Sequence, residues 1–141
     1  MNKIYVLFTL IIMSNLSLAQ DEKLVGTWVG NDKEGILIKF IFDDEGYVTM
    51  VSDGVEFGGK KFDVNGISAS MKYKTDQSVN PHKVNYLLKD LSGEYPTTTM
   101  GGVYQYINDN SIKFRINPNL GESYDRFVDE VDEDTFILKK E

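Results

Sequence analysis

The sequence of 141 residues contains no cysteine, one histidine and one tryptophan. Without cysteine the chain has no disulfide framework, and it has no thiolate that could act as a nucleophile or a metal ligand. The single histidine, His82, follows Pro81 in a stretch expected to be a turn, and no second imidazole could share a metal ion with it. We therefore expect no metal site and no catalytic role for His82.

Basic residues are fewer than acidic ones, 15 against 22, which gives a net charge of −7. This charge argues against nucleic acid and anionic membrane surfaces as partners, because both would repel the protein. The acidic run 129–134 lacks the central glycine and the closing glutamate of an EF-hand loop. We expect a solvated surface segment there, with calcium binding as the alternative.

Familiar catalytic patterns are also missing. No G-x-S-x-G elbow occurs, and the glycine pairs 58–59 and 101–102 do not open a helix that could hold a phosphate. A pair of carboxylates arranged for glycoside hydrolysis cannot be placed by sequence spacing alone. The sequence therefore predicts a protein that is not an enzyme and has no cofactor, and a hydrolase or isomerase in a barrel mouth is the least favoured alternative.

A long apolar run is absent except at the amino terminus, where Lys3 precedes the run 4–13 and the segment ends in Ser17-Leu18-Ala19. This pattern is typical of a signal peptide, residues 1–19, cleaved before Gln20. The alternative, an uncleaved anchor, would need about 20 apolar residues. Removal of residues 1–19 leaves 122 residues with a net charge of −8. We expect an exported protein, periplasmic or secreted, that is monomeric and does not insert into a membrane.

Alternation of apolar and polar residues with period two dominates residues 20–141. The clearest examples are residues 36–42 and 112–117, and such alternation predicts β-strands. We expect strands at 24–30, 36–42, 47–51, 68–74, 84–88, 103–107, 112–117 and 136–138. The glycine-rich segment 52–66 gives no clear prediction. About eight strands joined by short links indicate one all-β domain, an antiparallel up-and-down β-barrel, with an open sandwich as the alternative.

The first expected strand carries the pattern Leu24-x-Gly26-x-Trp28, which resembles the G-x-W signature at the start of lipocalins and related calycins. In that family the tryptophan plugs one end of the barrel and a basic residue from late in the chain packs on it. The resemblance implies such a plug here, made by Gly26 and Trp28, with Arg126 as the first candidate for the cation and Lys139 or Lys140 as alternatives. The T-D-Y motif of transport lipocalins is absent.

Three further segments are similar to motifs of small exported bacterial lipocalin-like domains of unassigned function. Asp76 to Asn85 resembles a D-x-x-x-x-P-K-x-I-D stretch, with Asn85 in place of the aspartate. Gly102-Val103-Tyr104 resembles G-I-Y, and Arg126-Phe127 resembles a shortened R-P-x-x-F loop without its proline. This resemblance implies a barrel fold and leaves the activity open, because a fold alone does not fix a function.

Aromatic residues on the apolar faces of several strands are the remaining indication of function. They either fill the barrel as a core or line an apolar cup in which arginine and tyrosine hydroxyls hold the polar end of a ligand. The candidate ligand-binding residues are Phe40, Tyr73, Tyr86, Tyr104, Phe114 and Arg115. We expect a binding or accessory domain that holds a small hydrophobic ligand, and the alternative is a protein-interaction or envelope-stress module with a filled barrel.

Overall fold

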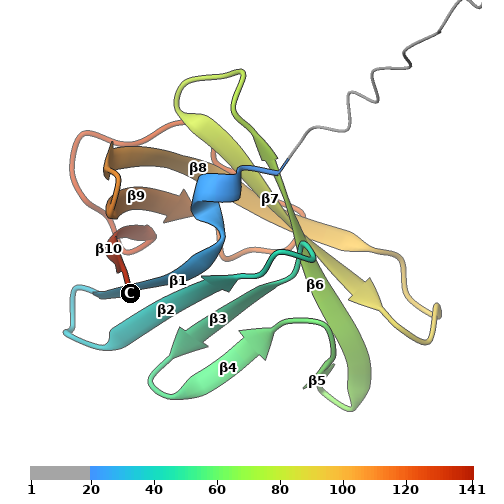
Figure 1. Cartoon of the computed structure of the whole chain (residues 1–141). Coiled ribbons are helices and arrows are strands. Elements are labelled where there is room, and N and C mark those ends of the chain that lie inside the picture. Colours follow the sequence, from blue (N-terminus) through green and yellow to red (C-terminus); the bar gives the residue numbers. More distant parts are fainter. Residues whose placement is uncertain (1–19) are drawn as a thin grey trace, which may run out of the picture.

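A computed structural model describes residues 20–141. The expected signal peptide, residues 1–19, lies outside the described residues, so its cleavage remains a prediction. The described chain forms ten antiparallel strands wrapped into a nearly closed barrel (Figure 1). Its only helical element is the 3₁₀ turn Glu22–Leu24, and no helix among the described residues is long and apolar enough to span a bilayer.

The strands follow one another along the chain with short turns, except for the long segment before the last one. They are β1 (Gly26–Asn31), β2 (Leu37–Phe42), β3 (Val48–Ser52), β4 (Val55–Gly58), β5 (Phe62–Val64), β6 (Ile67–Asp76), β7 (His82–Asp90), β8 (Thr98–Asn108), β9 (Ser111–Ile116) and β10 (Thr135–Lys140).

The order of strands in the sheet is β4-β3-β2-β1-β10-β9-β8-β7-β6-β5. Each strand therefore pairs with its neighbours in sequence, except that β4 and β5 do not pair and that β10 pairs with β1. The pairing of the first and last strands places Trp28 opposite Lys140. This up-and-down order confirms the expected antiparallel topology.

A seam remains where the two ends of the sheet meet. Tyr47 forms a bridge with Lys72 there, and the Tyr73 amide donates to the Gly46 carbonyl at 3.0 Å. The Met71 amide donates to the Gly59 carbonyl at 2.8 Å. These bonds join β6 to the chain before β3 and after β4. The barrel is therefore nearly closed, although no continuous ladder of hydrogen bonds crosses the seam.

The expected number of strands, eight, is wrong, because the structure has ten. The two additional strands, β4 and β5, are short and lie in the glycine-rich segment that gave no clear prediction. Gly58 and Gly59 adopt positive φ, and they lie where the chain leaves β4 and turns toward β5. A β-carbon at Gly58 would overlap the Val48 carbonyl oxygen, so close backbone approach requires glycine there.

Large aromatic side chains fill the middle of the barrel. The rings of Phe40 and Phe114 are stacked with centroids 5.5 Å apart, and Phe42 stacks on Phe114 at 5.8 Å. We call this group the aromatic cluster; its members are Phe40, Phe42, Tyr73, Tyr86, Tyr104 and Phe114, and each is no more than 3% exposed. Part of the barrel interior is therefore solid core.

The segment before β1 closes one end of the barrel, and we call residues 20–24 with Trp28 the plug. Tyr104 and Tyr106 donate their hydroxyls to Asp21 Oδ2 at 2.9 and 2.8 Å. Trp28 is fully buried, and its Nε1 donates to the Leu24 carbonyl at 2.8 Å. The plug thus joins β1 to β8 through buried polar contacts, and Trp28 is buried as expected.

Lys140, and not Arg126, is the cation that lies over Trp28. Its Nζ is 5.4 Å from the centre of the indole ring, and it also donates to the Lys23 carbonyl at 3.2 Å. Arg126 is exposed and lies on the segment before β10. The expectation of Arg126 is therefore wrong, because the pairing of β1 with β10 sets Lys140 directly opposite Trp28.

Burial raises the pKa of Tyr73 to about 12, and it also raises the pKa values of Tyr86, Tyr104 and Tyr106 well above their usual range. An unfolded tyrosine ionises near pH 10. The folded chain therefore binds more protons than the unfolded chain above this pH, and we expect its stability to fall between about pH 10 and 12. Phenolate absorbance should show these four tyrosines ionising together with unfolding, whereas in denaturant all tyrosines should ionise near pH 10.

Tyr86→Phe provides the matched variant for this titration. The Tyr86 hydroxyl is buried, and it has no hydrogen-bond partner among the described residues. Its removal should leave the free energy of unfolding at neutral pH unchanged or slightly higher, and the step that accompanies alkaline unfolding should lose one phenolate. Gradual ionisation of the four tyrosines in the folded protein would contradict their burial.

Candidate functional site

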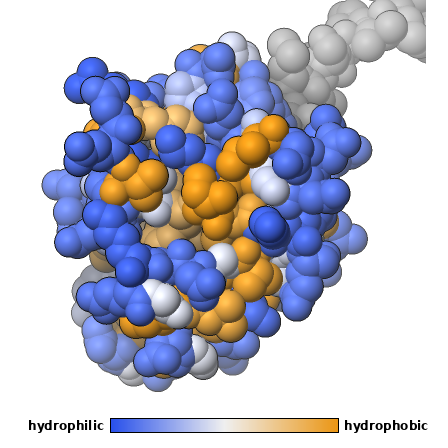
Figure 2. All heavy atoms as spheres, turned by 90° about the vertical axis from the view of Figure 1, so that its left-hand side faces the viewer, coloured by the Kyte–Doolittle hydropathy of each residue, from blue (hydrophilic) through white to orange (hydrophobic). Residues whose placement is uncertain are grey.

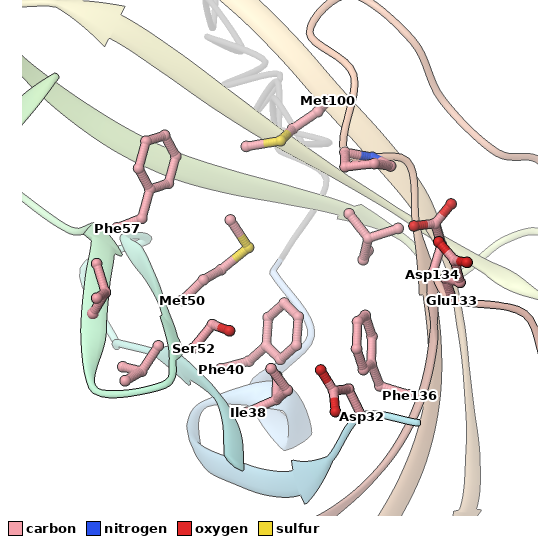
Figure 3. A pocket seen from close by; sticks show the side chains of 14 residues that line it. Asp32, Ile38, Phe40, Met50, Ser52, Phe57, Met100, Glu133, Asp134 and Phe136 are labelled. Atoms are coloured by element: carbon pink, nitrogen blue, oxygen red, sulfur yellow. The ribbon is translucent and has the colours of Figure 1, made fainter. Parts of the chain in front are cut away.

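A cavity of about 400 Å³ opens at the end of the barrel opposite the plug, and we call it the cup (Figure 3). Along β8, Met100 lines the cup, whereas Tyr104 and Tyr106 further along the strand reach the plug. Phe40 belongs to both the cup lining and the aromatic cluster, so the cluster forms the floor of the cup. The barrel interior is therefore filled at one end and hollow at the other.

The walls of the cup are apolar and come from both halves of the sheet. Figure 3 shows the side chains of β2, β3 and β4 facing those of β8 and β10 across the cavity. Phe40 and Phe136 lie with ring centroids 5.9 Å apart at one side. The apolar lining residues are Ile38, Phe40, Met50, Val51, Val55, Phe57, Met100, Ile116, Pro118 and Phe136. Such a lining resembles that of small-molecule sites in size and chemistry.

The charged residues that line the cup are all acidic: Asp32, Glu133 and Asp134. Asp32 follows β1 directly, and its Oδ1 accepts from the amides of Glu34 at 2.8 Å and Ile36 at 2.9 Å. These two bonds fix the carboxylate in the β1–β2 turn. Glu133 is exposed and Asp134 is half-buried just before β10. The mouth of the cup therefore carries negative charge.

Apolar side chains also reach the surface of the barrel. Val55 lines the cup and is 70% exposed, and Leu37 at the start of β2 is 47% exposed. On the side of the molecule where the β1–β2 turn lies, apolar side chains gather in the middle of the face and hydrophilic ones surround them (Figure 2). The apolar interior is therefore accessible from solvent.

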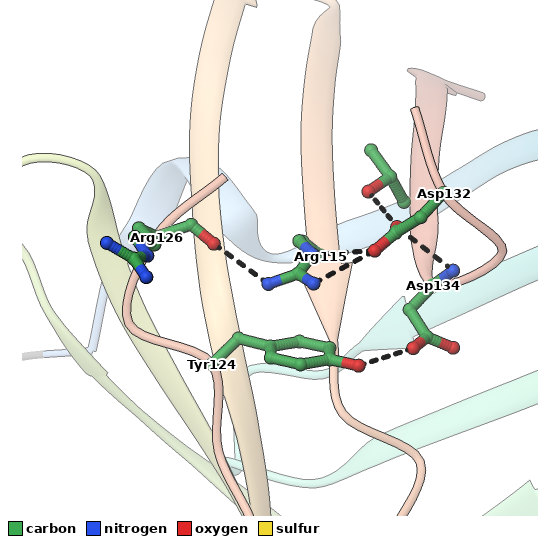
Figure 4. Close-up of polar contacts among 6 residues, drawn as sticks. Arg115, Tyr124, Arg126, Asp132 and Asp134 are labelled. Carbon is green, nitrogen blue, oxygen red and sulfur yellow. Dashed lines mark hydrogen bonds and ion pairs between the residues drawn. The ribbon is translucent and has the colours of Figure 1, made fainter. Parts of the chain in front are cut away.

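One wall of the cup depends on the segment between β9 and β10, which Arg115 holds in place (Figure 4). The Arg115 guanidinium donates to Asp132 Oδ2 at 2.9 and 3.0 Å and to the Arg126 carbonyl at 3.1 Å. It also lies 3.5 Å from the centre of the Tyr124 ring, and the Tyr124 hydroxyl donates to Asp134. We call these contacts the arginine clamp. The clamp positions Asp134, one of the acidic lining residues.

The arginine clamp should respond to acid. Burial acts to raise the pKa of Asp132, but hydrogen bonds from Thr135 and Arg115 outweigh it, and the pKa lies below its usual range. The lowered pKa means that the ionised Asp132 stabilises the folded clamp. This stabilisation is fully present above the pKa of an unfolded aspartate, about 3.9, and is lost as the pH falls through the lower pKa of the folded state. Hydrogen exchange should then show residues 118–134 opening as the pH falls below about 4.

Arg115→Gln tests the clamp at neutral pH. Loss of the charged hydrogen bonds should make opening of residues 118–134 easier by about 2 kcal/mol. Hydrogen exchange followed by mass spectrometry should show faster exchange there and unchanged exchange in β6 and β7, which do not pair with β9 or β10. Lys139→Gln, on β10, is the matched control, because Lys139 is exposed and no described bond joins its side chain to residues 118–134. Equal protection in Arg115→Gln and the parent would show that the clamp does not hold the segment.

The structure brings only one of the six candidate ligand-binding residues to the cup, and that residue is Phe40. Tyr73, Tyr86, Tyr104 and Phe114 are packed inside the aromatic cluster and have no share in the lining. Arg115 belongs to the clamp and does not line the cup either. The alternation along each strand identified the residues that face the barrel interior. It could not show at which end of the barrel these side chains pack together and at which end they line a cavity.

Several lining residues were missed by reasoning from the sequence. Phe57 lies in the segment without a clear prediction, and Met100 lies outside the expected strands, between 84–88 and 103–107. Glu133 and Asp134 lie in the acidic run that was expected to be solvated. Asp32 could have been placed in a turn from the sequence, because an aspartate followed by Glu34 and then by Gly35 three positions later is typical of a turn.

Among the described residues, no group of three or more histidine, aspartate or glutamate side chains is arranged to hold a metal ion. His82 lies beside the plug, where its ring is 5.3 Å from that of Tyr104 and its Nδ1 is 3.0 Å from the Val79 carbonyl. The acidic run contributes Asp132 to the clamp and Asp134 to the bond with Tyr124.

No protein-family model, no curated protein and no solved structure matches the chain. The nearly closed antiparallel barrel is compatible with a lipocalin-like fold. The geometry of the cup is therefore the basis on which a function can be proposed.

Proposed function

We propose that this protein is an exported, monomeric lipocalin-like binding domain that holds a small apolar molecule in the cup. The observation that carries the proposal is the cavity of about 400 Å³, apolar and open to solvent at one end of the barrel. Ligand sites commonly have volumes of roughly 300 to 1,000 Å³ and mostly apolar linings. The plug and the opposite open end agree with the lipocalin resemblance of the Leu24-x-Gly26-x-Trp28 pattern.

The lining favours binding over catalysis. Strongly shifted pKa values tend to occur at catalytic sites. Here the large shifts belong to Tyr73, Tyr86, Tyr104 and Tyr106, which lie in the aromatic cluster and around the plug and do not line the cup. The cup itself offers aromatic rings and the flexible thioethers of Met50 and Met100, which adapt to ligands of different shape.

The neutral dye N-phenyl-1-naphthylamine, which fluoresces in apolar surroundings, tests this proposal. The parent protein should bind it saturably, and Met50→Trp, which fills the cup, should weaken binding roughly tenfold or more. Ile137→Trp is the matched control, because Ile137 is 44% exposed on β10 and does not line the cup.

The control variant should bind the dye as the parent does. Absence of saturable binding by the parent, or equal binding by Met50→Trp and the parent, would reject the cup as a ligand site. Native mass spectrometry of protein purified from its own source should in addition reveal a retained small molecule, and the retained mass should be lost from Met50→Trp.

A further inference from the structure

The cup has a charge preference in addition to its apolar lining. Among the fourteen described residues that line it, three are acidic, and none is lysine, arginine or histidine. The arginine nearest in sequence to a lining residue, Arg115, has its guanidinium engaged by Asp132 and the Arg126 carbonyl. Among the described residues that line the cup, no cation therefore neutralises the negative charge of the carboxylates at its mouth.

The three carboxylates stand beside apolar walls. Figure 3 shows Asp32 on the side of the pocket where Phe136 lies, with Glu133 and Asp134 further along the same side. Asp32 uses Oδ1 for its two backbone bonds, and these bonds do not engage Oδ2. Low-dielectric walls strengthen the field of charges at the mouth of a cleft. A positive group placed there is attracted, and a carboxylate is repelled.

We infer that the ligand of the cup is a small amphipathic amine, whose apolar body lies against Phe40, Met50 and Met100 and whose ammonium group lies at Asp32, Glu133 and Asp134. This inference rests on the proposed function, because it assigns the chemical class of the molecule in the same cup. The aromatic rings of Phe40 and Phe136 add a favourable surface for a cation. The geometry disfavours fatty acids and other anionic amphiphiles.

Three compounds with the same octyl chain separate the inference from the proposed function: octylamine, octanol and nonanoate, whose carboxylate carries a chain of eight apolar carbons. Displacement of N-phenyl-1-naphthylamine at neutral pH and low salt measures their affinities. We expect octylamine to bind roughly tenfold more tightly than octanol, and nonanoate to bind more weakly than octanol. The preference should shrink in high salt, because the carboxylates lie at a solvent-exposed mouth.

Glu133→Gln removes one charge from an exposed side chain without a described hydrogen-bond partner, so it should fold normally. We expect it to weaken octylamine binding roughly threefold and to leave octanol binding unchanged. Asp109→Asn is the matched control, because it removes a negative charge from the turn after β8, about nine residues or ~30 Å along the strand from Met100. It should change neither affinity.

The combined variant Asp32→Asn/Glu133→Gln/Asp134→Asn should bind octylamine and octanol equally. Octanol binding together with equal affinities for octylamine and nonanoate in the parent would overturn the amine assignment and leave the apolar cup in place. The amine assignment would also be overturned if Glu133→Gln and the combined variant both preferred octylamine over octanol as strongly as the parent does. Failure of all three compounds to displace the dye would reject the proposed function as well.

Discussion

Trp28→Ala should lower the free energy of unfolding by about 3 to 5 kcal/mol, the range measured for removal of a large buried aromatic side chain. The indole extends from β1 and is fully buried within the plug, and its ring centroid lies 6.2 Å from that of Tyr106. Its loss would leave a cavity and an unpaired Leu24 carbonyl. Chemical denaturation followed by circular dichroism measures the change.

Two further substitutions separate the parts that the Trp28 side chain plays. Trp28→Phe keeps an aromatic ring but loses the bond to Leu24, and we expect a loss of about 1 to 2 kcal/mol. Lys140→Met removes the cation over the ring together with its bond to the Lys23 carbonyl, with an expected loss of about 0.5 to 1 kcal/mol. A loss in Trp28→Ala no larger than that in Lys140→Met would show that the tryptophan does not hold the plug in place.

Asp21→Ala should lower the free energy of unfolding by about 3 kcal/mol, because it leaves two tyrosine hydroxyls without their acceptor. Tyr104 and Tyr106 both donate to one oxygen of Asp21, and the Asp21 amide donates to Thr75 Oγ1 at 3.2 Å. Asp21 is 8% exposed, so water cannot readily replace the lost carboxylate. Thermal and denaturant unfolding of a chain of residues 20–141 measure the change.

Asp21→Asn retains an acceptor oxygen at the same place and should lose only about 1 kcal/mol. A double-mutant cycle of Asp21→Ala with Tyr106→Phe isolates the bond between the two side chains, and its coupling energy should be about 1 to 2 kcal/mol. Coupling near zero would show that the Asp21–Tyr106 bond does not contribute to stability. Dye binding in the cup should persist in folded Asp21→Asn, because the plug lies at the other end of the barrel.

The antiparallel barrel topology could be predicted from the sequence because its signal is local. Alternation such as that of Ile112, Phe114 and Ile116 records which side of a strand faces the core, and all three are buried. Links of a few residues then favour pairing of neighbours in the sequence. The strands β4 and β5 gave no such signal, because they are only four and three residues long and glycines interrupt the period.

The partner of Trp28 could be predicted only as a class of residue. A cation from late in the chain was expected, and several were available. Lys140 is selected by the register of β1 with β10, which is a contact between the two ends of the described chain. Sequence spacing carries no information about such a register, because it depends on how the whole sheet curls and closes.

The cup illustrates the same limit for the site. An inward-facing aromatic residue has the same local pattern whether it packs in a core or lines a cavity, so Phe40 and Phe114 could not be distinguished. The acidic residues of the mouth come from the β1–β2 turn and from the segment before β10. These two segments are far apart in the chain, and the closed sheet brings them together.

By itself, the sequence determined the antiparallel strands, their inward faces and the absence of thiol chemistry, because these follow from residue type and from the period of the backbone. The tertiary structure alone decided which interior residues meet and where a volume stays empty. It therefore decided that Lys140 covers Trp28 and that three carboxylates stand at an apolar cup. The physical reason is that closing the barrel fixes the distances between residues far apart in the sequence, and the local sequence around each residue does not constrain these distances.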